Sequence, residues 1–368
     1  MPEARVIQFP APAWSVEPAR DAKTVAEELL AESLEERSSE AWGAICDADV
    51  AVAVADLLRL DLNSNPNRVL SEAEAAYERI STSERRMGVF DEKDYLLGDY
   101  ALLAGIANRL SGNFESAEGW FDLADASFRQ TIDPYPSSMR VAHARLVVRY
   151  ELRRFSDVVS LITGVISGFE SRGMLEDAFK ARFLQATSYK ELGNFNRSLE
   201  CLVALQESIP GSQVTLRSFV LTNLAEEYAR RADHDRALTT YEAALALTDP
   251  EQNAMAYAQL MGSVGESYRL KGEYALAVTC FRAATNKYAA LGMATRVASL
   301  RVVTAETLLT IGRDREAEWE ILAALPTIED QRMVVEGFGA TALLKESVRR
   351  RRTDPAALRE LSAALRAK

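Results

Sequence analysis

GESYRLKGEYALAVTCFRAA, residues 265–284, contains the pattern that decides the fold. Gly272 and Tyr274 mark a short turn, and Ala277, Phe281 and Ala284 follow at spacings that place them on one face of a helix. The same turn pattern begins at residues 112, 153, 193, 232 and 312, so with 272 the steps are 41, 40, 39, 40 and 40. Self-similarity at such a nearly constant step, which we call the repeat step, is typical of stacked repeats.

The pattern predicts a first helix, a tight turn and a second helix in each repeat. The turn glycines suit the left-handed conformation that ends a helix. We therefore predict an all-α superhelix of about six to seven helix pairs, with capping helices at both ends. The expected divisions are a flexible arm at 1–20, N-terminal helices with a degenerate repeat at 21–94, a superhelix of six such repeats at 95–327, and capping helices at 328–368. The cap includes a helix from about 329, after Pro326, to 350, and another over 353–368.

Residues 265–284 combine a small residue, a tyrosine, a glycine before an aromatic residue, and an alanine–aromatic–alanine series. This combination resembles the tetratricopeptide repeat. The 40-residue step is longer than the usual unit and resembles the long-helix subgroup of the maltose-operon activator, kinesin light chains and Gram-positive peptide-receptor regulators. This resemblance implies a superhelix that binds proteins or peptides in its concave groove, and it says little about which partner is bound.

Composition excludes several other classes of protein. The net charge of −11 does not favour a nucleic-acid partner. No apolar run is long enough for a membrane span, and three widely spaced cysteines indicate neither disulfides nor a zinc site. We expect a cytoplasmic protein without cofactor or metal. The two histidines, His143 and His234, lie in different repeats, so we assign them packing roles and expect no enzymatic activity.

A series of acidic residues is the candidate binding feature. Glu226, Glu266 and Glu306 recur at steps of 40, and Asn223 and Ser263 precede the first two by three residues. The family resemblance implies that this position lines the concave wall. We take Lys190, Thr187 and Phe183 as the corresponding places in the preceding repeat. The alternative is a solvated helix face with local pairs such as Glu266 with Arg269.

The function predicted from these features is a non-enzymatic scaffold or adaptor that binds a protein or peptide, with a basic partner suited to the acidic series. One alternative is a peptide-sensing regulator whose superhelix changes shape when ligand binds. Another is an enzyme subunit completed by a second chain. The arginine run 349–352 is interpreted as a helix end that complements the helix dipole. The oligomeric state stays open.

Overall fold

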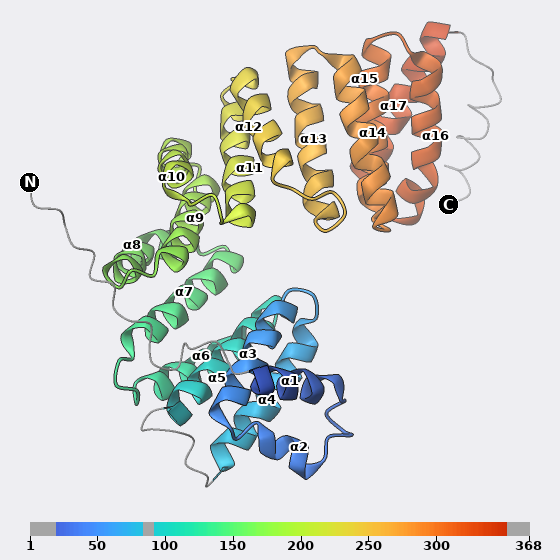
Figure 1. The fold of residues 1–368 in the computed structure, drawn as a ribbon. Helices are drawn as coiled ribbons and strands as arrows, with labels where there is room; N and C mark the ends of the chain where they lie inside the picture. Colours follow the sequence, from blue (N-terminus) through green and yellow to red (C-terminus); the bar gives the residue numbers. More distant parts are fainter. Residues whose placement is uncertain (1–19, 84–91, 352–368) are drawn as a thin grey trace, which may run out of the picture. The chain divides into compact units, whose positions relative to one another are not determined.

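The computed structural model describes residues 20–83 and 92–351, and this part of the chain consists of helices joined by short turns (Figure 1). Contacts divide the chain into two compact units, residues 1–198 and 199–368, so the boundary falls within helix α10. The arm predicted at 1–20 lies outside the described residues except for its last residue, and so does the helix predicted at 353–368.

The first unit contains the N-terminal helices and the first repeats. Its helices are α1 (Arg20–Ala31), α2 (Ser39–Ala44), α3 (Ala48–Asp61), α4 (Pro66–Thr82), α5 (Glu92–Leu110), α6 (Phe114–Phe128), α7 (Tyr135–Glu151), α8 (Phe155–Ser171) and α9 (Leu175–Glu191), followed by the start of α10 (Phe195–Ser208). Within residues 35–46, α2 occupies six residues, and turns flank it on both sides. A buried ion pair between Arg37 and Glu72, with contacts of 2.5 and 2.7 Å, ties the segment before α2 to α4.

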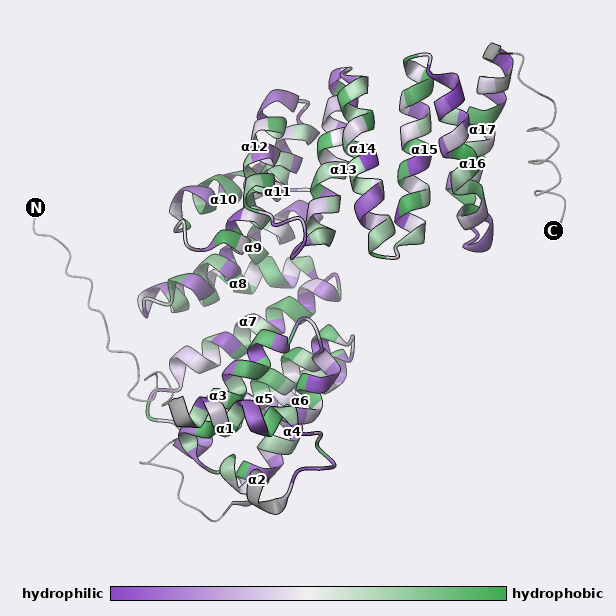
Figure 2. Cartoon of the chain, turned by 45° about the vertical axis from the view of Figure 1, so that its right-hand side comes forward, coloured by the Kyte–Doolittle hydropathy of each residue, from purple (hydrophilic) through white to green (hydrophobic). Residues whose placement is uncertain are grey.

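The second unit continues the same arrangement of helix pairs. Its helices after α10 are α11 (Val214–Arg230), α12 (His234–Ala246), α13 (Ala254–Lys271), α14 (Tyr274–Ala290), α15 (Ala294–Thr310), α16 (Asp314–Asp330) and α17 (Val334–Arg351). Figure 2 shows hydrophobic and hydrophilic residues interleaved along each helix, as expected when one face is buried. Each first helix, α11, α13 or α15, packs against the second helix that follows it.

Left-handed residues end the first helices, as the turn pattern predicts. Gly272 has φ of 84°, and its N–H closes the helix onto the carbonyls of Tyr268 and Arg269. The same conformation is held without glycine by Arg153, with φ of 60°, and Ala232, with φ of 59°. The repeat register is therefore kept even where the sequence carries a residue with a steric cost in this region.

The predicted close approach of the two helices in a repeat is seen at Gly265. A Cβ atom built there would lie 2.7 Å from ring atoms of Phe281 and 3.2 Å from the Cβ of Cys280. Phe281 is fully buried, and Ala277 and Ala284 on the same stripe of α14 have no exposed surface. The stripe predicted from residues 265–284 is thus the packing face of this helix pair.

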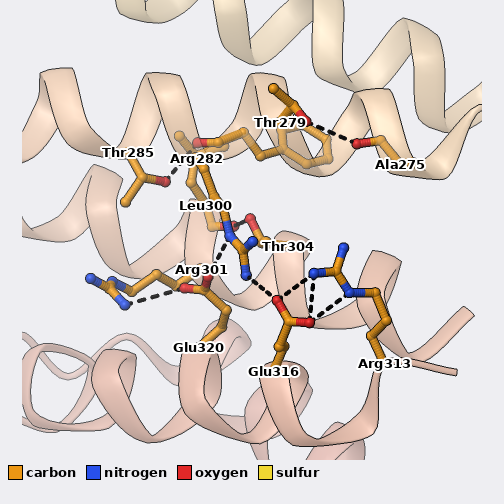
Figure 3. Close-up of polar contacts among 11 residues, drawn as sticks. Ala275, Thr279, Arg282, Thr285, Leu300, Arg301, Thr304, Arg313, Glu316 and Glu320 are labelled. Carbon is orange, nitrogen blue, oxygen red and sulfur yellow. Dashed lines mark hydrogen bonds and ion pairs between the residues drawn. The ribbon is translucent and has the colours of Figure 1, made fainter. Parts of the chain in front are cut away.

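Charged side chains fix the register of α14, α15 and α16. Glu320 on α16 is 3% exposed and accepts hydrogen bonds from Arg282 Nε and Arg301 Nη1, both at 3.2 Å (Figure 3). Arg282 also donates to Glu316 at 3.0 Å. The guanidinium of Arg301 lies 4.9 Å from the ring centroid of Trp319. One buried carboxylate therefore connects three helices from two repeats through charge-assisted hydrogen bonds.

The predicted boundary at 327/328 is wrong, because it falls inside α16. Pro326 lies within α16, and the helix continues to Asp330 before α17 begins at Val334. Proline lacks an N–H, so α16 loses one intrahelical hydrogen bond at this position and still continues for another turn. The first helices are also longer than expected, at 17 to 19 residues for α5, α7, α9, α11, α13 and α15.

Candidate functional site

Three of the predicted acidic residues occupy equivalent places on consecutive first helices of the second unit. Glu226 lies on α11, Glu266 on α13 and Glu306 on α15, each four or five residues before the end of its helix. Glu226 and Glu266 are half-buried, and Glu306 is exposed. Among the first helices of this unit, α11 contacts α13 and α15 contacts α17. We call the series Glu226, Glu266 and Glu306 the acidic ladder.

Arg269 binds one member of the acidic ladder and feels the charge of the next. Its Nε and Nη2 donate to the two carboxylate oxygens of Glu266 at 2.8 and 2.7 Å, a bidentate pair. This hydrogen bonding is the main cause that raises the pKa of Arg269, and the Glu306 carboxylate adds to the increase. Glu306 therefore lies within the electrostatic range of a guanidinium that Glu266 already binds. The predicted local pair between Glu266 and Arg269 forms.

The first member of the ladder lies near a buried tyrosine. Burial raises the pKa of Tyr241 on α12, the Glu226 carboxylate raises it further, and a hydrogen bond with Ser263 lowers it. Asn223 donates from its side-chain amide to the carbonyl of Phe219 at 3.0 Å, one turn earlier on α11. Asn223 and Ser263 are both half-buried.

The sequence analysis missed a fourth residue in this register. Glu346 lies on α17, one repeat step after Glu306, and Arg349 donates to its two carboxylate oxygens at 2.8 and 2.9 Å. The pair repeats the geometry of Glu266 with Arg269 two repeat steps further along the chain. The predicted end of the repeats at residue 327 left Glu346 outside the series, although Glu346 lies one repeat step after Glu306. Arg349, interpreted as part of a helix-end run, is therefore also the partner of a ladder position.

The residues predicted in the preceding repeat lie on α9 of the first unit. Phe183, Thr187 and Lys190 are half-buried. Thr187 is four residues before the end of α9, as Glu226 is before the end of α11, so Thr187 and not Lys190 stands in register with the ladder. The Thr187 hydroxyl donates to the carbonyls of Phe183 and Leu184 at 3.1 Å. The residue at the ladder position therefore changes from the neutral Thr187 on α9 to the acidic Glu226 on α11.

Neither histidine lies with a group of catalytic side chains. Burial lowers the pKa of His143 on α7 to about 4, and its ring meets Phe169 edge-on at 6.1 Å between centroids. His234 begins α12. Within residues 20–83 and 92–351, no group of three His, Cys, Asp or Glu side chains is placed to hold a metal ion. No described helix combines the length and apolar character that a membrane crossing requires.

No protein-family model and no curated protein matches this chain. Among solved structures, it is similar to a signal transduction ATPase with numerous domains that carries a tetratricopeptide repeat sensor, from Pyrococcus horikoshii. The TM-score is 0.67 at 12% identity, over 94% of this chain and 52% of that protein. The fold is a tetratricopeptide-like helical solenoid. The chain spans about half the length of the archaeal protein.

Two bacterial structures are also similar to this chain. The apo form of the quorum sensor NprR from B. thuringiensis has a TM-score of 0.51 at 11% identity, over 83% of this chain and 98% of that protein. Aspartyl phosphate phosphatase F from Bacillus subtilis has a TM-score of 0.50 at 10% identity, over 90% of this chain and 94% of that protein. At these identities the similarity concerns the fold.

Proposed function

We propose that this chain is a non-enzymatic, cytoplasmic scaffold or adaptor that binds a protein or peptide along the first helices of its repeats. The observation that carries this proposal is the acidic ladder. Glu226, Glu266 and Glu306 occupy one register on α11, α13 and α15 with their side chains half-buried or exposed. A surface that repeats one chemical group at a fixed step suits an extended partner rather than a reaction centre.

The spacing and charge of the ladder favour a basic peptide. Packed helices lie about 8–10 Å apart, and an extended peptide rises ~3.3 Å per residue. Every third residue of such a peptide then meets one rung, so lysine or arginine at that interval suits the surface. Because Glu306 is the exposed member of the ladder and Glu266 already binds Arg269, we expect Glu306 to be the rung most accessible to the peptide.

A peptide-display selection on the full chain, repeated with a variant, tests this proposal. Replacing Glu226, Glu266 and Glu306 by Gln removes three charges and keeps the side-chain shape. The matched control replaces three exposed acids from other helices and turns of the same unit, Glu207, Glu242 and Glu251. We expect selected peptides to be enriched in lysine and arginine, and to bind the ladder variant less tightly and with weaker salt dependence than the control. Equal loss of affinity in the two variants contradicts the proposal.

A peptide-sensing regulator is the second candidate. The similarity in fold to the quorum sensor NprR favours it, as does the electrostatic influence of Glu306 on the Arg269 that Glu266 binds. In this case ligand binding changes the arrangement of the repeats, so small-angle scattering of the chain should differ with and without the selected peptide. An identical scattering profile at saturating peptide favours the scaffold.

A further inference from the structure

Two glutamates in the register of the ladder are each followed, three residues later, by an arginine that binds them. The stretches 266–269 and 346–349 share the pattern Glu-x-x-Arg and lie two repeat steps apart. In both, Nε and Nη2 of the arginine donate to the two carboxylate oxygens, at 2.8 and 2.7 Å in the first pair and at 2.8 and 2.9 Å in the second. Residues three apart are neighbours on a helix, so each pair forms within a single helix.

The other two positions of the register have an apolar residue where these pairs have arginine. Ala229 follows Glu226 by three residues, and Leu309 follows Glu306 by three. Leu309 is 4% exposed and belongs to the core that α15 forms with α16. Arginine and an apolar residue therefore alternate along the four positions. The four glutamates and two arginines together carry a net charge of 2 − 4 = −2.

The pair on α13 lies at the surface. The side chains of Arg269 and Glu266 are 29% and 43% exposed, and an ion pair of this kind contributes little to the stability of a protein. It has a larger effect on the charge that the surface offers to a ligand. The guanidinium engages both oxygens of Glu266 and repels a second cation that approaches them. We propose that Arg269 is a built-in counter-ion, which withholds Glu266 from a basic peptide and so sets the affinity of the acidic ladder.

The role of Arg269 rests on the proposed function, since it concerns the same surface. A row of carboxylates without counter-ions attracts cations at any spacing. Neutralising every second position makes the attraction depend on where the cations of the peptide lie, because a cation opposite a neutralised glutamate gains little. Arg269 is in this sense a residue that determines specificity, and Arg349 has the same relation to Glu346.

Removing the counter-ion tests the proposal. The probe is a fluorescent synthetic peptide with lysine at every third position, and its affinity for the full chain is measured by fluorescence anisotropy over a series of salt concentrations. Arg269→Gln removes the cation, and Arg269→Lys keeps the charge. The matched control is Arg236→Gln on α12, which removes one cation from another pair at the same spacing, since Arg236 Nε lies 3.5 Å from the Asp233 carboxylate.

We expect Arg269→Gln to bind the probe at least about fivefold more tightly than the wild type, with a steeper loss of affinity on adding salt. Arg269→Lys and Arg236→Gln should both stay within about twofold of the wild type. Thermal unfolding of each variant confirms that the fold is kept. An Arg269→Gln variant that binds no more tightly than Arg236→Gln overturns the proposal.

A double-mutant cycle separates a counter-ion of Glu266 from a cation that only lowers the total charge. In a Glu266→Gln background, Arg269→Gln should tighten binding by less than about twofold, because no carboxylate is left to be released. An equal gain in both backgrounds also overturns the proposal. The proposed function fails separately, and this role with it, if the wild type and the variant with Gln at 226, 266 and 306 bind the probe alike.

Discussion

Two glycines within α13 and the glycine that caps it allow one substitution to be tested in three environments. Gly272→Ala places a Cβ on a residue with φ of 84°, where no neighbouring atom lies within 4 Å. The left-handed conformation costs an L-residue roughly 1–2 kcal/mol, and the lower entropy of the unfolded alanine chain returns roughly 0.4–1 kcal/mol. We therefore expect Gly272→Ala to reduce the free energy of unfolding by about 1 kcal/mol, which lowers Tm by roughly 2–4 °C for a unit of this size.

Gly262 is the matched control, because it lies inside the same helix with open space around its Cβ position. Gly262→Ala should stabilise the protein by up to about 1 kcal/mol through helix propensity alone. Gly265→Ala differs from both, since its Cβ would lie 2.7 Å from the Phe281 ring. Overpacking costs roughly 1–3 kcal/mol, so the net effect is destabilising.

Urea unfolding of the full chain, followed by far-ultraviolet circular dichroism, measures these differences. The slope of free energy against urea should be unchanged, and the midpoints should fall on either side of the wild-type value. Ala232→Gly supplies the reverse experiment, since φ is 59° there, and it should stabilise the chain. If Gly262→Ala and Gly272→Ala shift the midpoint in the same direction, backbone conformation at the turn does not control stability, and the argument fails.

Three further predictions concern buried polar groups. Glu320→Gln should cost about 1–3 kcal/mol, because two arginines lose their charged acceptor, whereas Glu316→Gln at a more exposed pair should shift the midpoint less in the same urea assay. The pKa of His143 is lowered from 6.5 to about 4, so its neutral form is favoured in the folded chain. Stability is therefore full above pH 6.5 and falls as pH drops from 6.5 to 4, and His143→Gln should flatten this part of the curve measured by thermal unfolding. Burial raises the pKa of the Cys280 thiol, so iodoacetamide at mildly alkaline pH should label Cys280 more slowly than Cys46, as followed by mass spectrometry.

The repeat turns could be predicted from the sequence because a left-handed residue is a local requirement. The turn aromatics Phe114, Phe155, Phe195 and Tyr274 each begin a second helix, as the pattern indicates. In the second repeat Phe155 meets Tyr150 edge-on, with ring centroids 5.2 Å apart, and so covers the corner between two helices. The pattern does not mark the turns between repeats, where Arg332 has φ of 50° without any glycine signal.

The predictions from sequence differ from the structure where tertiary packing overrides a local sequence signal. Pro326 was interpreted as a residue beyond a helix, yet packing of Ala324 and Ile328 keeps α16 intact around it. Of the residues predicted on α9, Thr187 is the one that lies as far from its helix end as Glu226 does on α11. The role of the acidic ladder in binding stays a prediction, because the sequence specifies the register of the ladder and not its ligand.

The electrostatic influence of two carboxylates on Arg269 has a consequence for genetics. If Glu266 is removed, Glu306 still acts on the Arg269 guanidinium, so the second acid retains part of the electrostatic role of the first. Single substitutions along this surface should then look nearly silent in a mutational scan, and paired substitutions should show strong epistasis. A scan that reads one position at a time would rank these residues as dispensable, although together they set the charge of the surface.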